Sequence, residues 1–263
     1  GTCLLVDVGT NAEVVLGNNE WLMACAGAAG PALEGGVAAM GMMAGPGAID
    51  KVEIDRSSRE IRFNTIGGVS PKGICGSGLI DLAAHLFLSG MIDLRGKFIE
   101  NACSGRLIDI DGVKNLIIVK GEETEQGKDL YLSQTDINAL IRSKAAMYTI
   151  LNTITNMANI NIREIDRFYI AGTFGAYIDP VSAISLGMIP DLPQEKYVSV
   201  GNTSIEGVTM ALLSSENLKE IYKIRDMVTY IELNVNQEFM NNFSAAKFIP
   251  HTDRSLFPSV REP

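Results

Sequence analysis

The sequence predicts an α/β fold, with a mixed β-sheet flanked by helices and an inserted α+β subdomain. Three strand-like segments follow one another near the start of the chain, and later segments alternate between strand-like and helix-like patterns. Between these two parts lies a stretch with a hairpin and a helix of its own. We therefore expect a lobe core over residues 1–40 and 130–235, an inserted subdomain over 41–129, and a C-terminal helix and extended arm over 236–263.

The first two strands flank a short polar turn. Two apolar runs, Leu4–Val8 and Val14–Leu16, are separated by Gly9-Thr10-Asn11, where glycine and asparagine supply turn conformations that β-branched residues resist. Asp7 lies beside backbone N–H groups that can form a concave nest for phosphate. This carboxylate would repel a bare phosphate, so it indicates a magnesium ion between the two. Taken alone, the pattern favours a tight hairpin with a capping aspartate.

A second apolar strand also runs into a glycine-rich turn. Arg167–Ala171 is followed by Gly172-Thr173-Phe174-Gly175, where glycines allow a flat ring or a ribose to lie against the backbone. Together the two strand-and-turn elements resemble the second phosphate motif and the adenosine motif of the actin-like ATPase superfamily, which includes sugar kinases and heat-shock chaperone ATPases. The resemblance implies a ribonuclease H-like lobe that binds nucleotide. We expect the two turns to converge on one cleft, because strand ends in open α/β sheets gather ligand loops on one edge.

Composition and charge exclude several classes of function. The chain has 263 residues and a net charge of −9, which argues against nucleic acid or an anionic membrane surface as the main partner. Its four cysteines, Cys3, Cys25, Cys75 and Cys103, lie far apart and there are two histidines, which argues against a zinc or iron–sulfur site. Reduced thiols in a cytoplasmic protein are the simplest interpretation.

No stretch fits a signal peptide or a membrane span. Residues 22–49 are poor in charge, but prolines and many glycines interrupt them. The chain opens at Gly1-Thr2, directly before a core strand, and we interpret it as a fragment of a longer protein.

The inserted stretch contains a half-exposed hairpin and a helix. Val52–Asp55 and Glu60–Phe63 alternate apolar with polar residues. A glycine-rich run then opens a helix over residues 79–88, with Ser77 as the expected N-cap. Glycines before a helix can also bind anions, so Gly76 and Ser77 are possible ligand contacts, although such a motif is often only a cap.

The second half of the lobe core begins with a long helix. Ser133 and Asp136 form a capping-box pattern, and apolar residues at helical spacing continue to about Asn159. A short helix over 181–186 and a strand over 196–200 follow. The turn Gly201-Asn202 then opens a helix reaching Leu213.

The chain closes with short elements. We expect a helix over 215–227 capped by a serine, a strand over 228–233, a short helix over 237–243, and an extended arm from Phe248 onward.

Six motifs, in the same order, resemble the reductive activators of corrinoid proteins more closely than the superfamily at large. Members of that family are ATP-dependent and return an oxidised Co(II) corrinoid on a methyl-transfer protein to Co(I). They carry a ferredoxin-like iron–sulfur domain, a linker and an actin-like ATPase region. The motifs are Asp7–Glu13, Gly30–Gly36, Pro46–Ile49, Gly73–Asp81, Ala171–Gly175 and Gly201–Ser204.

The resemblance assigns roles to particular residues. Asp7 would orient Mg²⁺ through water, and Gly9, Thr10 and Asn11 would hold phosphate of ATP or ADP. Gly172, Thr173, Phe174 and Gly175 would form the adenosine side, with Gly201 and Asn202 as possible further contacts. It supplies no catalytic base in this chain, and the iron–sulfur cluster is expected only in an N-terminal domain outside it.

Two other functions stay open at this point. One is a small-molecule kinase of the same superfamily, which would need an acceptor pocket with a positioned base. The other is a non-catalytic dimerisation or interaction module. As an activator, the full-length protein would be an ATPase and redox activator acting on a corrinoid protein, whereas the isolated chain would be inactive. We also expect a homodimer, formed through the edge of the three-strand meander and the Gly27–Gly36 loop.

Overall fold

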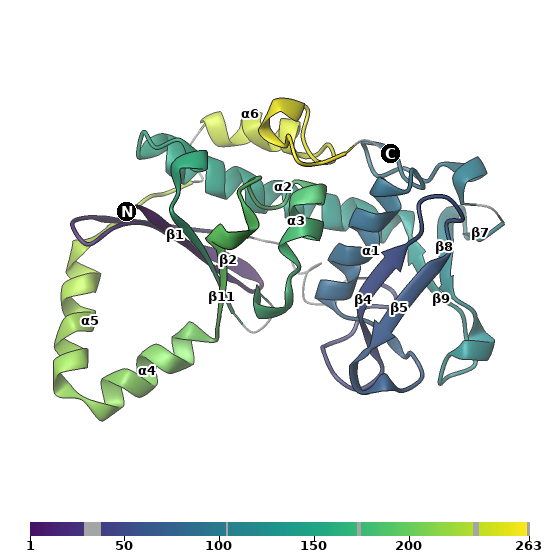
Figure 1. Cartoon of the computed structure of the whole chain (residues 1–263), viewed down its shortest axis with the longest axis horizontal. Coiled ribbons are helices and arrows are strands. Elements are labelled where there is room, and N and C mark those ends of the chain that lie inside the picture. The colour runs from purple at the N-terminus through teal and green to yellow at the C-terminus, as the bar shows by residue number, and fades with distance from the viewer. Residues whose placement is uncertain (29–37, 104, 173–174, 234–236, 262–263) are drawn as a thin grey trace.

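The structure is a computed structural model, and it describes residues 1–28, 38–103, 105–172, 175–233 and 237–261 (Figure 1). Within these residues the strands form one six-stranded sheet, of order β11-β10-β1-β2-β3-β12, and two three-stranded sheets. The strands of the large sheet are β1 (Cys3–Val8), β2 (Asn11–Gly17), β3 (Leu22–Ala28), β10 (Arg167–Ala171), β11 (Tyr197–Gly201) and β12 (Val228–Tyr230).

The large sheet is mixed, as the sequence predicts. β2 is antiparallel to both β1 and β3, whereas β10 runs parallel to β1 and β11 runs parallel to β10. Alternate side chains of β1 are buried, including Leu4 and Val6, and the same alternation continues in β2. The short strand β12 pairs parallel with β3, so the edge of the meander is covered within the chain.

The long helix of the lobe core, α2, begins at a capping box. The confirmed capping box opens α2: Asp136 N–H donates to Ser133 Oγ and Ser133 N–H donates to Asp136 Oδ2, both at 3.0 Å. α2 packs against β2 and β3, and α6 packs on α2 in turn (Figure 1). The helices of this part are α2 (Gln134–Met157), α3 (Pro180–Leu186), α4 (Thr203–Leu213), α5 (Ser215–Met227) and α6 (Gln237–Ala246).

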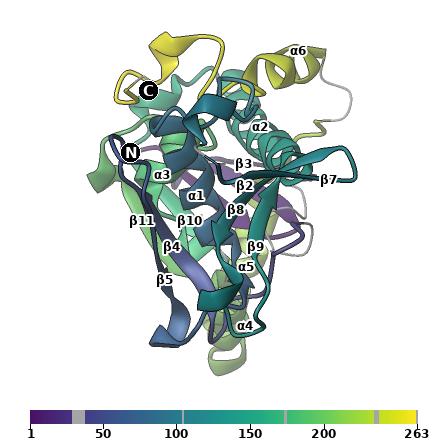
Figure 2. The ribbon, with the colours of Figure 1, turned by 90° about the vertical axis from the view of Figure 1, so that its right-hand side faces the viewer.

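The two small sheets lie at the end of the molecule opposite α5, and Figure 2 views that end. One has the order β5-β4-β6 and the other β7-β8-β9. β9 follows residue 129 in the sequence, yet its hydrogen bonds join it to β8 of the insertion. The elements are β4 (Ala48–Ile54), β5 (Ile61–Thr65), β6 (Gly73–Ile74), α1 (Gly76–Leu88), β7 (Leu107–Ile110), β8 (Val113–Val119) and β9 (Leu130–Ser133).

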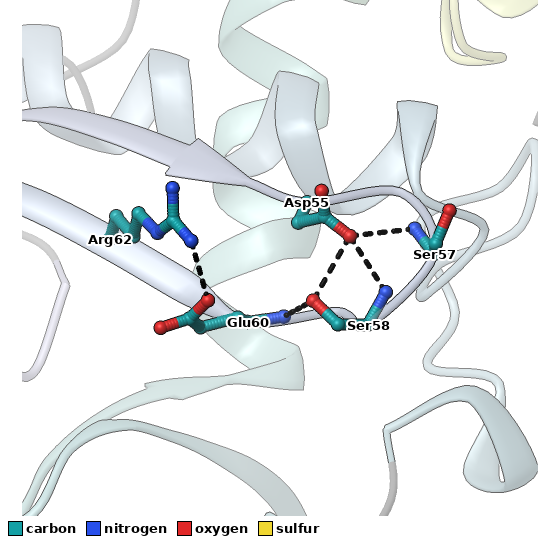
Figure 3. Close-up of polar contacts among 5 residues, drawn as sticks. All are labelled: Asp55, Ser57, Ser58, Glu60 and Arg62. Atoms are coloured by element: carbon teal, nitrogen blue, oxygen red, sulfur yellow. Dashed lines mark hydrogen bonds and ion pairs between the residues drawn. The ribbon is translucent and has the colours of Figure 1, made fainter.

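The turn between β4 and β5 is held by one carboxylate (Figure 3). Asp55 Oδ1 accepts hydrogen bonds from Ser57 N–H at 3.0 Å, Ser58 N–H at 2.7 Å and Ser58 Oγ at 2.9 Å. Hydrogen bonds to the ionised form lower the pKa of Asp55, chiefly those from Ser58. Arg62 of β5 forms an ion pair with Glu60, which directly precedes the strand. The pairing of β4 with β5 confirms the predicted hairpin, and its turn is locally ordered.

The expectation that Ser77 caps α1 is wrong. Cys75 occupies the N-cap position with extended backbone angles, and no side chain caps the helix. Ser77 is buried inside the first turn, where its hydroxyl donates to the Asp50 carbonyl at 3.3 Å. α1 also packs very closely on β4: a Cβ at Gly78 would lie 2.3 Å from the Ile49 carbonyl oxygen. The glycines of this run therefore permit a tight helix–strand contact.

A buried lysine ties the C-terminal arm to α2. Lys144 is fully buried, and its ammonium donates to the carbonyl oxygens of Phe248 and Pro250, the latter at 2.8 Å. Burial lowers the pKa of Lys144 well below its usual range. The arm also packs Phe257 against Tyr148 of α2, with ring centroids 5.2 Å apart. Among the described residues, no helix is long and apolar enough to cross a membrane.

Candidate functional site

Three parallel strands of the large sheet end at the same edge. In the register of β1 and β10, Asp7 lies opposite Ala171, and in the register of β10 and β11, Ala171 lies opposite Gly201. The loops that leave these strands therefore start side by side, although about 160 and 190 residues of chain separate them. A hydrogen bond from Gly172 N–H to the Gly201 carbonyl, at 2.9 Å, joins the second loop to the third.

Gly172 packs directly on Asp7. Its φ is +91°, and a Cβ there would lie 2.7 Å from Asp7 Oδ1 and 2.7 Å from the Val8 carbonyl oxygen. Only glycine combines this backbone angle with this approach. Gly175 is similarly enclosed, because its Cβ would lie 2.9 Å from Ile170 Cγ2. The structure thus brings Asp7, Gly172 and Gly175 together at one edge of the sheet, and the single cleft expected to join them and Thr10 stays a prediction.

The third loop brings a hydroxyl to the Asp7 carboxylate. Ser204 Oγ donates to Asp7 Oδ2 at 3.4 Å, while Gly201 turns the chain with φ +66°. Asn202 caps α4, its side-chain oxygen accepting from Ile205 N–H at 3.1 Å. Sequence reasoning did not include Ser204 among the site residues. The available signal was its place at the start of a helix that follows a strand ending in glycine.

The first loop is a compact hairpin turn. Gly9 N–H donates to the Asn11 carbonyl at 2.9 Å, so this donor is used within the turn. Thr10 and Asn11 are exposed to solvent beside the half-buried Asp7. A phosphate-binding nest in this turn would therefore be formed by Thr10 and Asn11.

The remaining predicted residues fall outside this cluster or outside the description. Gly76 and Ser77 lie at the start of α1, and the hydrogen bonds of Ser77 are with Asp50 and Cys75 of the insertion. Thr173 and Phe174 lie outside the described residues, as does the whole Gly30–Gly36 motif.

A separate cavity of about 410 Å³ lies between the insertion and the lobe core. Its walls come from the β4–β5 hairpin, from Asp81 and His85 of α1, and from Asp179 and Ser182 of α3. Burial raises the pKa of Asp81 to about 6, although the Ser182 hydrogen bond acts in the opposite direction. His85 accepts from Ile54 N–H through Nδ1 at 3.3 Å, and burial lowers its pKa. None of the described residues predicted for the nucleotide site lines this cavity.

The cysteines do not suit an iron–sulfur cluster. All four are free thiols, and Cys25, Cys75 and Cys103 are buried. Burial raises the pKa of Cys25 to about 12 and that of Cys103 to about 11, which opposes the thiolate form that binds metals. Over the part of the chain that the structure describes, no group of three or more His, Cys, Asp or Glu side chains is placed to hold a metal ion. A hydrated Mg²⁺ bound with nucleotide phosphates needs fewer protein ligands, and the single carboxylate of Asp7 fits that requirement.

Comparison with known proteins decides the family. Residues 1–261 match the model of the C-terminal domain of RACo, the ASKHA domain. The chain belongs to this family. The RACo ASKHA domain has the actin-like ATPase fold, so the fold class and the family resemblance expected from the sequence are both confirmed.

Relatives of this RACo-type ASKHA domain are corrinoid activators. The corrinoid activation enzyme RamQ of Eubacterium limosum is 34% identical over 91% of this chain and 41% of its own length. A reductase of the Co(II) methylated amine-specific corrinoid protein from Methanosarcina barkeri is 29% identical over 91% of this chain and 44% of its own length. A solved reductive activator for a corrinoid, iron–sulfur protein superposes with a TM-score of 0.93 and 42% identity, over 98% of this chain and 41% of that one. The chain therefore spans less than half the length of these proteins.

Proposed function

We propose that this chain is the ATP-binding lobe of an ATP-dependent reductive activator, which restores Co(I) in a corrinoid methyl-transfer protein. The observation that carries the proposal is the meeting of Asp7, Gly172 and Ser204 at the edge where three parallel strands end. The RACo-type relatives support it, because each of the named proteins is a corrinoid activator or reductase. Their names favour this function over the small-molecule kinase and over the non-catalytic module.

We assign each part of the nucleotide to different residues at this edge of the sheet. Asp7 would hold Mg²⁺ through water, and the Gly9-Thr10-Asn11 turn would hold the phosphates of ATP or ADP. Ser204, by donating to Oδ2, fixes the orientation of the Asp7 carboxylate. Gly172 and Gly175 carry no side chain, so the ribose and base can lie against the backbone at these two positions. We assign Thr173 and Phe174 to the same adenosine side.

The ATP-dependent step is conformational. Nucleotide binding would close this lobe on the rest of the activator and couple closure to docking on the corrinoid protein. Reduction of Co(II) to Co(I) requires one electron. Because the cysteines of this chain do not suit an iron–sulfur cluster, we assign the electron-carrying cluster to another domain of the full-length protein. The free thiols agree with a cytoplasmic location, and we propose a homodimer as the assembly.

The proposal is tested with the full-length protein encoded by the reading frame that contains this chain. It is mixed with a Co(II) corrinoid protein, a low-potential reductant and MgATP, and Co(I) formation is followed by absorbance. We expect Asp7→Asn to abolish ATP-dependent Co(I) formation. Asp111→Asn is the control, because Asp111 is exposed in a turn and asparagine tolerates its left-handed backbone conformation. This variant should leave ATP-dependent Co(I) formation unchanged. Equal rates for Asp7→Asn and wild type would contradict the proposed role of this edge.

A further inference from the structure

The cavity of about 410 Å³ between the insertion and the lobe core has acidic side chains from both parts of the chain. Glu53 of β4 and Asp81 of α1 belong to the insertion, and Asp179 directly precedes α3 of the lobe core. α1 packs on both β4 and α3 (Figure 2). A molecule bound in this cavity would therefore contact the insertion and the lobe core at once.

Asp81 is the most buried of these three acids, and one of its oxygens is unsatisfied. The residue is only 7% exposed, and within the described part of the chain Oδ1 has no hydrogen-bond partner. The Ser182 hydroxyl and the Val52 N–H favour the ionised carboxyl, but neither meets Oδ1 with hydrogen-bond geometry. A buried carboxylate oxygen without a donor is unfavourable. Because the outer torsion of an aspartate is soft, a modest rotation turns Oδ1 toward a donor in the cavity.

The donor that suits this position carries a positive charge. Burial raises the pKa of Asp81, and the negative charge of Asp179 raises it further, so the two carboxylates repel each other. A cation between them would relieve this repulsion and supply a donor to Oδ1. Lys51 and Arg62 also line the cavity, but both are exposed, and Arg62 forms its ion pair with Glu60.

The rest of the lining favours an organic cation over a metal ion. Among the described residues, no group of three or more His, Cys, Asp or Glu side chains is placed to hold a metal. Val52 and Phe63 add an apolar wall, and an aromatic ring attracts both hydrocarbon and a neighbouring cation. The volume lies within the range of roughly 300–1,000 Å³ that is typical of small-molecule sites. An N–H group is required for the hydrogen bond to Asp81, which a quaternary ammonium lacks.

We propose that this cavity binds a small molecule with a primary ammonium group, held between Asp81 and Asp179, with its hydrocarbon part against Phe63. The bound molecule joins α1 of the insertion to the start of α3. Asp179 follows Gly175 of the second loop by four residues, so this cavity is a second site close in sequence to the nucleotide-binding edge. The inference does not rest on nucleotide binding, because none of the described residues assigned to the nucleotide lines the cavity.

The test is titration calorimetry of n-butylammonium chloride into the full-length protein, in phosphate buffer because Tris itself carries a primary ammonium group. We expect wild type to bind, and Asp81→Asn and Asp179→Asn each to weaken binding by at least about tenfold. Both changes keep the size of the side chain and remove its charge. Asparagine also preserves the cap that Asp179 Oδ2 provides by accepting from Ser182 N–H at 2.9 Å. The exposed variant Asp111→Asn is the control and should bind as wild type does.

Three further titrants distinguish the proposed ligand class from its alternatives. Tetramethylammonium has the same charge without an N–H group and should bind at least about tenfold more weakly than n-butylammonium. Equal affinities, or displacement of n-butylammonium by Mg²⁺, would overturn the ammonium site. Displacement by MgADP would assign the cavity to the nucleotide and also overturn it, as would a wild type that does not bind n-butylammonium. Asp81→Asn should retain MgADP binding, so failure of this proposal is distinguishable from failure of the nucleotide-binding edge.

Discussion

Gly172 approaches Asp7 so closely that an alanine Cβ at position 172 would lie 2.7 Å from the Oδ1 atom of the carboxylate. Two loops that are remote in sequence thus share one contact. In the proposed site this contact sets both the position of the Asp7 carboxylate and the floor against which the nucleotide lies. The contact explains why the second turn starts with glycine.

Gly172→Ala should therefore be costly in two ways. The new methyl group meets Asp7 and the Val8 carbonyl, and the backbone angle of +91° strains any non-glycine residue. We expect the free energy of unfolding in urea to fall by at least roughly 2 kcal/mol. Gly105→Ala, with φ +71° and no atom within 4 Å of the added Cβ, isolates the backbone cost of about 1 kcal/mol. Equal losses for the two variants would show that the contact with Asp7 is not restrictive.

Asp81 should make stability depend on pH. Burial raises its pKa from 3.8 to about 6 in the folded state, so the folded protein favours the protonated carboxyl. The stabilising effect of that proton is complete below about pH 4 and is lost as pH rises through 6. Asp81→Asn stays neutral at every pH. It should match wild type near pH 4 and exceed it above pH 7 by up to about 3 kcal/mol. Parallel pH profiles for the two proteins would contradict this account.

Lys144 should anchor the C-terminal arm. Lys144→Met keeps the buried volume but leaves the carbonyls of Phe248 and Pro250 without their donor. We expect a loss of roughly 2 to 4 kcal/mol in the free energy of unfolding, with faster proteolysis after residue 248. Lys128→Met, at an exposed position, is the control and should change stability little. An arm that resists protease equally in both variants would mean that other contacts hold it.

Much of the fold follows from local pattern. Short-range sequence patterns predict the meander, the capping box at Ser133 and Asp136, and the two glycine turns. The family motifs indicate the order in which these elements occur along the chain. Convergence of Asp7 with Gly172 was predictable because parallel strands place their carboxyl ends on one edge.

Other features depend on contacts that sequence pattern does not encode. Ser77 is a residue type that often caps helices, but here it lies within α1 and its hydroxyl donates a hydrogen bond to the Asp50 carbonyl. β12 is only three residues long, and it pairs with β3, which is about 200 residues away in the sequence. No local pattern predicts this pairing. Ser204 belongs to a helix start whose relation to Asp7 appears only when β11 lies beside β10. The sequence likewise gives no sign that α4 and α5, which contact each other, contain no buried residue.

The most direct test of the nucleotide-binding edge is titration calorimetry of MgADP into this 263-residue chain, repeated with EDTA. A lobe that lacks its opposing half should bind weakly, near millimolar, because losing half of the contacts costs several kcal/mol and every ~1.4 kcal/mol is tenfold in affinity. The account predicts that EDTA weakens binding to wild type, that Asp7→Asn removes this magnesium dependence, and that Asp111→Asn keeps it. Magnesium-dependent binding that is equally strong in wild type and Asp7→Asn would contradict the placement of the site at this edge of the sheet.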